Sequence, residues 1–173
     1  MSNNTNWTID ATHSEIAFKV KHMMISTVTG HFEDFTATAK TDGESFENAS
    51  IEFSAKTASI NTKNADRDAH LKSDDFFNSE KFPEMKFVSK SFKGDKLVGD
   101  LTIRDITKEI TLDAELNGIA VDPYGQTKAG LEIKGEINRK DFNLTWSAVT
   151  EAGSIVVSDK VKLVVDVQFI KQA

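Results

Sequence analysis

The sequence contains no cysteine, which excludes a disulfide framework, a thiolate metal site and a cysteine nucleophile. It also lacks an excess of positive charge: 21 Lys and Arg residues stand against 27 Asp and Glu residues, a formal net charge of -6. No cluster of basic residues stands out. Because binding to a phosphate backbone requires a positively charged surface, we expect no nucleic-acid partner.

Long apolar runs are missing as well. No segment approaches the roughly 18 consecutive apolar residues of a membrane span, so the chain is not expected to span a membrane. Residues 1–6 have neither the basic start nor the apolar run of a secretory signal, and we expect them to form a flexible N-terminus. The expected location is the cytoplasm, or the periplasm if the starting Met replaces a native leader.

The motifs of common enzyme chemistry are also absent: the sequence has no Gly-rich phosphate loop, no Gly-x-Ser-x-Gly elbow and no His-Glu-x-x-His helix. The four histidines, which do not have the spacing of a helical or zinc-finger metal site, are His13, His22, His31 and His70. The sequence therefore predicts neither a metal nor a cofactor.

What the sequence does contain is an alternation of apolar and polar residues with a period of two, typical of antiparallel strands with one apolar face. Eight such runs occur, at 16–20, 35–39, 49–55, 85–87, 97–103, 110–116, 129–135 and 161–169. Residues 93–95 predict a hairpin, and residues 122–125 predict a turn. Closing one-faced strands into a barrel buries their apolar faces and removes the sheet edges. We therefore predict an all-β protein, an eight-stranded antiparallel β-barrel, as a single domain over residues 1–173.

Two irregularities interrupt the alternation. Phe32 is out of phase with Phe35, which predicts a β-bulge near Glu33 and Asp34. The second is a helical insert around residues 64–77. Its helix is predicted over 64–72, with Asn64 as the N-cap and with Asp66 and Asp68 favourable to the helix dipole.

The predicted interior mixes large and small residues. The large ones include Phe18, Phe35, Phe53, Phe87 and Phe169, and the small ones are Ala37, Ala39, Ala49, Ala55, Gly99, Ala114, Ala129 and Gly135. An eight-stranded barrel is either just filled by side chains or just wide enough for one slender ligand. Small inward residues indicate unfilled volume, whereas pairing of each small residue with a Phe across the barrel would fill it. The pattern leaves both alternatives open.

The densest polar clusters lie around His13 and along residues 67–71. One interpretation makes His13, Asp68 and His70 an acid and base set, with Arg67 holding an anion. The preferred interpretation is structural: Asp68 pairs with Arg67 or caps the helix, His70 bonds a strand end, and His13 forms a turn.

Aromatic residues gather after the predicted helix, at Phe76, Phe77, Phe82 and Phe87. Together with Trp146 they could line the mouth of the barrel. The alternative is that these residues seat the helix on the barrel wall.

The order and spacing of several motifs resemble a known family. These motifs are Trp7-Thr8-Ile9-Asp10 with His13-Ser14, Val28-Thr29-Gly30-His31-Phe32, Ala58-Ser59-Ile60-Asn61-Thr62 with Arg67-Asp68-Ala69-His70-Leu71, Asp75-Phe76-Phe77, Phe82-Pro83, Gly99-Asp100-Leu101-Thr102-Ile103, Thr107, and Ile137-Asn138-Arg139-Lys140-Asp141-Phe142. From Trp7 to about Phe169 the chain resembles the YceI-like polyisoprenoid-binding proteins.

This resemblance implies a lipocalin-like barrel with a helical insert and an apolar channel. The channel would enclose an isoprenoid or quinone-like lipid, with its tail along the channel and its polar head near the mouth. The resemblance also implies no catalysis, and dimers occur in the family. Two departures are the missing export signal and Asn143, where the family often has Gly; Asn tolerates a left-handed backbone.

We therefore expect a carrier that holds a polyprenyl, quinone or related lipid and performs no chemistry on it. The alternative is a barrel-pocket enzyme, of isomerase or cyclase type, that uses His13, Asp68 and His70; a filled barrel acting as an interaction module is a third hypothesis. The candidate ligand-binding residues are His13, Phe18, Val20, Phe35, Ala37, Phe53, Arg67, His70, Phe76, Phe77, Phe87, Leu101 and Trp146.

Overall fold

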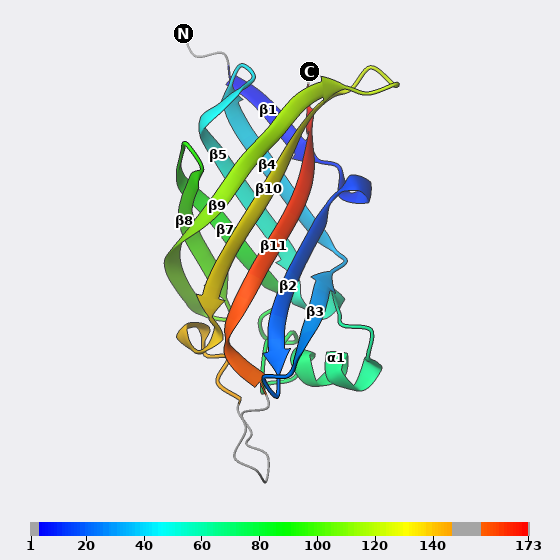
Figure 1. Ribbon diagram of the computed structural model, residues 1–173, viewed down its shortest axis with the longest axis vertical. Helices are drawn as coiled ribbons and strands as arrows, with labels where there is room; N and C mark the ends of the chain where they lie inside the picture. Colours follow the sequence, from blue (N-terminus) through cyan, green and yellow to red (C-terminus); the bar gives the residue numbers. More distant parts are fainter. Residues whose placement is uncertain (1–3, 147–156, 173) are drawn as a thin grey trace.

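The structure is a computed structural model that describes residues 4–146 and 157–172. It is a closed antiparallel β-barrel with one short α-helix at its lower end (Figure 1). This confirms the predicted fold class. Residues 1–3 of the expected flexible N-terminus lie outside the described residues.

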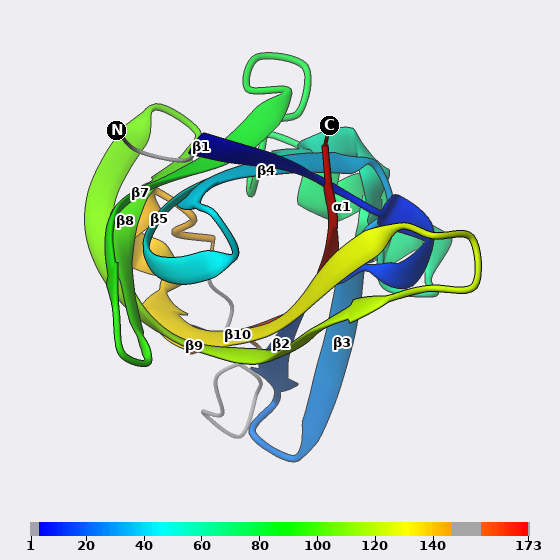
Figure 2. The ribbon, with the colours of Figure 1, turned by 90° about the horizontal axis from the view of Figure 1, so that it is seen from above.

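Eight strands form the ring, seen end-on in Figure 2. In ring order they are β1 (Asn4–Ile9), β4 (Phe35–Asp42), β5 (Ser45–Lys56), β7 (Glu84–Lys93), β8 (Lys96–Ile103), β9 (Ile106–Val121), β10 (Thr127–Asn138) and β11 (Val157–Lys171), which returns to β1. The predicted hairpin at 93–95 and the predicted turn at 122–125 lie between β7 and β8 and between β9 and β10.

The first predicted strand is not a member of this ring. It is β2 (Glu15–His22), which pairs with β11 over Val157 to Asp166, whereas β1 pairs with the last residues of β11. A side branch continues from β2 to β3 (Ser26–Phe32) and β6 (Ile60–Asn61). The ring strand that the sequence analysis missed is β1, because its two apolar residues, Trp7 and Ile9, make too short an alternating pattern and Trp7 alone is fully buried.

Two local predictions are corrected. Residues 4–6, expected in a flexible N-terminus, belong to β1 and pair with β4. The phase slip between Phe32 and Phe35 is a corner and not a bulge: β3 ends at Phe32 and pairs with β2, while β4 begins at Phe35 and pairs with β5. Because β3 and β4 pair with different strands, the alternation of apolar and polar residues need not continue from one to the other.

The predicted helix is confirmed as α1 (Ala65–Lys72). Asn64 is its N-cap, since its Oδ1 accepts a hydrogen bond of 3.0 Å from the backbone N–H of Arg67. Asp66 and Asp68 lie in its first turn, and residues 73–77 of the expected insert form turns. None of the helices in the described part of the chain is long and apolar enough to cross a membrane.

The barrel interior is divided into a packed upper half and a lower half that contains a cavity. The upper core packs large residues against alanines, and its large members include Trp7, Phe46, Phe92, Leu97 and Phe169. The Trp7 and Phe46 rings lie 5.2 Å apart, and the Trp7 Nε1–H donates to Thr41 Oγ1 at 2.8 Å. This core closes the end of the barrel near the two termini. The sequence pattern left open whether side chains fill the barrel or leave volume unfilled. Side chains fill the upper half, and the lower half keeps unfilled volume.

Candidate functional site

An apolar cavity of about 110 Å³ lies in the lower half of the barrel. Its wall is formed by Ile16, Ala17, Phe18, Phe32, Phe53, Ala55, Met85, Lys86, Phe87, Leu101, Ile103, Ile110, Leu112, Ile133, Ile137, Leu163 and Val165. Among the described residues of this wall, Lys86 is the one ionisable residue, and its side chain is mostly exposed to solvent. An engineered apolar cavity of about 150 Å³ stays dry and binds benzene. A cavity of the present size therefore suits one compact apolar group, such as the end of a prenyl chain.

Glycines opposite three large side chains give this cavity its shape. A Cβ on Gly30 would lie 2.3 Å from Cζ of Phe18, and a Cβ on Gly135 would lie 2.2 Å from Cδ2 of Leu112. The ring of Phe87 lies over Gly99 in the same way, with 2.6 Å between Cζ and the added Cβ. Each large side chain lies flat against the neighbouring strand, so the centre of the barrel stays open.

A wider mouth pocket of about 410 Å³ lies between the β2–β3 hairpin and α1. Its wall comprises Phe18, Val20, Lys21, His22, Val28, Thr62, Asn64, Asp66, Arg67, His70, Leu71, Phe76, Trp146 and Val157. Phe18 lines both the inner cavity and the mouth pocket. The Phe18 side chain therefore lies between the two spaces.

The polar residues of the mouth are held by bonds within the insert. The Arg67 guanidinium donates to Oγ1 and to the carbonyl of Thr62, at 2.8 and 2.6 Å. Asp68 Oδ1 accepts from the backbone N–H and the hydroxyl of Thr62, at 2.8 and 2.5 Å. His70 Nε2 lies 2.9 Å from Asp75 Oδ2. Both Arg67 and His70 line the mouth, so their outer faces are available to a polar head group.

Trp146 lies at the rim of the mouth and is positioned by a buried arginine. The Trp146 ring lies 4.9 Å from the ring of His70 and 5.5 Å from that of Phe76. Arg139, which is 3% exposed, donates to the carbonyls of Leu144 at 2.5 Å and Trp146 at 2.7 Å. It also donates to the carbonyl of Ser158 at the start of β11, at 2.9 Å. Burial lowers the pKa of Arg139 from its usual value.

The structure divides the sequence-predicted site residues into four groups. The inner cavity is lined by Phe18, Phe53, Phe87 and Leu101. The mouth is lined by Phe18, Val20, Arg67, His70, Phe76 and Trp146. Phe35, Ala37 and Phe77 belong to the packed clusters and line neither space. The fourth group is His13 alone.

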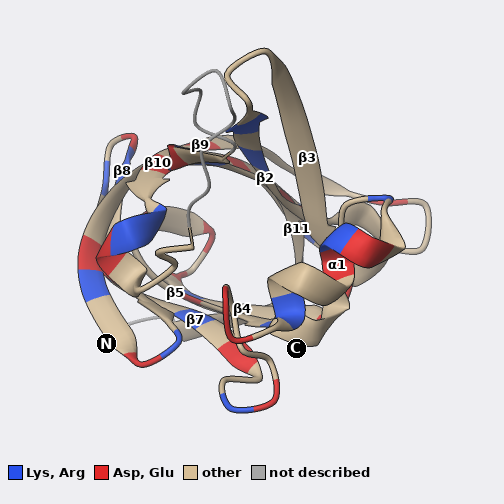
Figure 3. Cartoon of the chain, turned by 90° about the horizontal axis from the view of Figure 1, so that it is seen from below, with Lys and Arg blue, Asp and Glu red and all other residues tan. Residues whose placement is uncertain are grey.

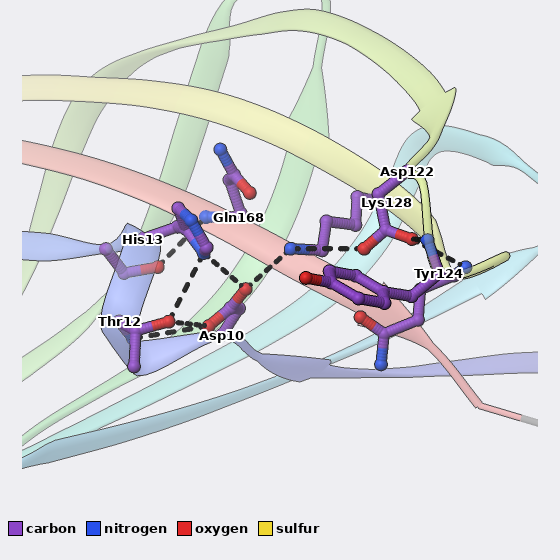
Figure 4. A network of polar contacts seen from close by, with 9 residues as sticks. Asp10, Thr12, His13, Asp122, Tyr124, Lys128 and Gln168 are labelled. Atoms are coloured by element: carbon purple, nitrogen blue, oxygen red, sulfur yellow. Dashed lines mark hydrogen bonds and ion pairs between the residues drawn. The ribbon is translucent and has the colours of Figure 1, made fainter.

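His13 lies at the other end of β2 from the mouth, in a polar network on the outer surface (Figure 4). Its Nδ1 is 2.8 Å from Asp10 Oδ2, and the Lys128 ammonium donates to the same carboxylate at 2.7 Å. Lys128 also pairs with Asp122 at 3.6 Å. Hydrogen bonds from Lys128, Thr12 and His13 hold the pKa of Asp10 far below its usual range. The acid and base set proposed from the sequence, which required His13 beside His70, is therefore not assembled.

Sequence reasoning missed part of the site. It did not single out Arg139, Val28 or Leu71 as binding or positioning residues, because their roles arise from chain segments that meet only in the folded barrel. The prediction for Asn143 is confirmed, since this residue adopts the left-handed conformation with φ 61° at the end of the 3-10 helix (Arg139–Phe142).

Comparison with known proteins places the chain in a family. The family described as YceI-like domain matches residues 7–169. The chain belongs to the YceI-like family. This YceI-like chain is 39% identical to a UPF0312 protein of Staphylococcus aureus over 166 residues, which cover 95% of this chain and 97% of that relative.

Solved structures of YceI-like proteins have the same fold. The crystal structure of the Campylobacter jejuni YCEI protein is 36% identical, with a TM-score of 0.76 over 88% of this chain and 90% of that one. A polyisoprenoid binding domain from Saccharophagus degradans has a TM-score of 0.74 over 99% of this chain and 100% of that domain. Because that domain is only 14% identical, its likeness shows the fold alone.

Proposed function

We propose that this YceI-like protein binds a long-chain isoprenoid or similar amphiphilic lipid, such as a polyprenyl chain or a quinone, and carries it without chemical change. The tail end occupies the inner cavity, the rest of the chain passes Phe18, and the polar head lies in the mouth. The observation that carries the proposal is the apolar wall of the inner cavity, which shares Phe18 with a wider, partly polar mouth.

The energetics favour an apolar chain in this cavity. Each CH2 group removed from water contributes about 0.8 kcal/mol, and the cavity wall offers a polar head group almost no partner. A charged or hydrogen-bonding group would therefore stay in the mouth, near Arg67 and His70. The Saccharophagus degradans polyisoprenoid binding domain has the same fold, and the proposal extends its class of ligand to this chain.

The arrangement of polar groups supports carriage rather than catalysis. A general acid or base must lie within hydrogen-bonding distance of the reacting atom. Asp68 is bonded to Thr62, His70 is paired with Asp75, and His13 belongs to the network at the far end of β2. These groups hold the structure together and do not converge on the inner cavity.

The test is to fill the inner cavity and measure the bound lipid. Val165→Phe on β11 places a ring in the cavity, while the neighbouring Val164→Phe changes the opposite face of the same strand and is the matched control. Native mass spectrometry with solvent extraction should find a prenyl lipid or quinone on the wild type and on Val164→Phe, and at least about tenfold less on Val165→Phe.

Two results would overturn the proposal. One is a wild-type protein that takes up no prenyl alcohol or quinone when these are supplied in solution. The other is a folded Val165→Phe variant with an unchanged lipid content. Ala37→Phe is unsuited to this test, because Ala37 lies in the packed upper core and the added ring would destabilise the fold instead.

A further inference from the structure

The loop of the β2–β3 hairpin, residues 23–25, exposes apolar side chains beside the mouth. Met24 is 61% exposed and Ile25 is 80% exposed. The hairpin strands contribute Val20, His22 and Val28 to the mouth, so the loop projects directly from the wall of the mouth pocket.

The backbone of this loop is unfavourable for the residues it carries. Met23 and Met24 both have positive φ, at 52° and 59°. Consecutive residues in this conformation are ordinarily Asn or Gly, because a bulky side chain clashes with its own backbone there. A loop selected for stability alone would have Asn-Gly at these positions. The methionines cost conformational energy, which points to a use for their side chains outside the barrel.

On the β2 strand, the charges next to the loop are positive. Lys19 and Lys21 lie on the exposed face of β2, and Lys162 of β11 is the cross-strand partner of Lys19. Like charges opposite one another destabilise a sheet. In the described part of the chain, ion pairs are found for neither Lys19 nor Lys21, and Lys21 Nζ donates only to Thr27 Oγ1 at 3.0 Å. In Figure 3, this end of β2 is coloured for Lys and Arg, and the adjoining loop to β3 carries no charged residue.

We propose that the β2–β3 hairpin docks on the surface of an anionic lipid bilayer, with Met24 and Ile25 inserted among the lipids and Lys19 and Lys21 against the head groups. Apolar side chains flanked by lysines are the combination that an anionic membrane surface binds. Docking would bring the mouth to the bilayer, so that a lipid can pass into the barrel without crossing water. This use of the mouth rests on the proposed function.

A second exposed apolar site provides the control. Val121 and Tyr124, at the β9–β10 turn, are 68% and 89% exposed, but they lie at the closed end of the barrel beside Asp122. The neighbouring Lys128 is already paired with Asp10 and Asp122. This turn therefore has apolar exposure without free positive charge and without access to the cavity.

The experiment is cosedimentation of the full chain with vesicles of phosphatidylcholine and phosphatidylglycerol. We expect Met24→Ser/Ile25→Ser to weaken vesicle binding by at least about tenfold, because two apolar side chains no longer insert. Lys19→Gln/Lys21→Gln should weaken binding about tenfold on these vesicles and have little effect on phosphatidylcholine alone. Val121→Ser/Tyr124→Ser should bind as the wild type does.

The proposal is overturned if the wild-type chain does not sediment with anionic vesicles, or if the loop and control variants bind equally well. Uptake of dansyl-labelled geranylgeraniol in solution, without vesicles, separates this outcome from a failure of the proposed function. The loop variant should keep that uptake and lose vesicle binding, whereas Val165→Phe should lose uptake and keep vesicle binding.

Discussion

The ring of Phe18 lies against the backbone of Gly30, its cross-strand partner, so closely that a Cβ on Gly30 would be 2.3 Å from Cζ of the ring. Phe18 also lies 5.7 Å from Phe32, measured between ring centroids. Because Gly30 has no side chain, the Phe18 ring lies close against the wall, between the inner cavity and the mouth.

Gly30→Ala is expected to narrow the passage between the mouth and the cavity. The added methyl group displaces the Phe18 ring from the wall, and such overpacking costs about 1 to 3 kcal/mol of stability. Uptake of a prenyl alcohol, followed by fluorescence, should slow by about tenfold if the displacement raises the barrier by about 1.4 kcal/mol. Phe18→Leu in the same chain should restore the rate; a Gly30→Ala variant with wild-type stability and uptake would refute the role of Gly30.

A second glycine predicts a change in cavity volume. Gly135→Ala should push the Leu112 side chain into the inner cavity, since the new Cβ would lie 2.2 Å from Cδ2 of Leu112. The amount of bound lipid should fall, and stability should fall by about 1 to 3 kcal/mol. Gly130→Ala on the same strand is the matched control, because its nearest neighbour would be 4.0 Å away. Equal effects of the two substitutions on lipid content would contradict the prediction.

Arg139→Lys is expected to release Trp146 from the rim of the mouth. Lysine keeps the charge but loses the planar fork that reaches the carbonyls of Leu144, Trp146 and Ser158 together. Buried acceptors left without a donor should lower the free energy of unfolding by about 3 kcal/mol, measured in urea. Lys140→Gln, at the exposed neighbouring position, should cost much less.

Tryptophan fluorescence reports the same change at the mouth. Trp7 is fully buried in the upper core, so a Trp7→Phe background leaves the emission of Trp146 alone. A shift of this emission to longer wavelength is expected in Arg139→Lys and not in Lys140→Gln. Unchanged emission would mean that Arg139 does not position Trp146.

Asp10→Asn is expected to weaken the fold at neutral pH but not in acid. The pKa of Asp10 is depressed in the folded state, first of all by the hydrogen bond from Lys128, whereas an unfolded Asp has a pKa of about 3.9. Its contribution to stability is therefore present above about pH 4 and is lost as the pH falls below that value. Thermal or urea unfolding at neutral pH should show a loss of about 1 to 3 kcal/mol.

The pH series supplies the check on this prediction. The difference between wild type and Asp10→Asn should begin to shrink at about pH 4 and should go on shrinking as the pH falls toward the depressed pKa of Asp10, because in this range the unfolded chain binds a proton that the folded chain does not. Glu80→Gln, at an exposed position outside the network, is the control. A difference that stayed constant with pH would show that the Asp10 carboxylate contributes nothing through its charge.

Patterns among residues close in sequence were enough to predict most of the strands and the helix cap. Seven of the eight predicted strands are ring strands, because alternation along β4, β5 and β7 to β11 follows from burying one face of each strand. The cap at Asn64 was predictable because it depends on a residue three positions away. The roles of Phe18, Phe53, Phe87 and Leu101 as inward residues were predictable for the same reason as the strands.

The sequence by itself determined the class of fold, the position of the helix and which side chains face inward, since each depends on neighbours within a few residues. Only the tertiary structure decided that Trp7 closes one end of the barrel while Phe18 borders an open cavity at the other. It also separated His13 from His70 and joined Arg139 to Trp146 and Ser158. These relationships depend on which strands pair with one another and on the height of each residue along the barrel axis. An alternating pattern of apolar and polar residues specifies neither the strand pairing nor that height.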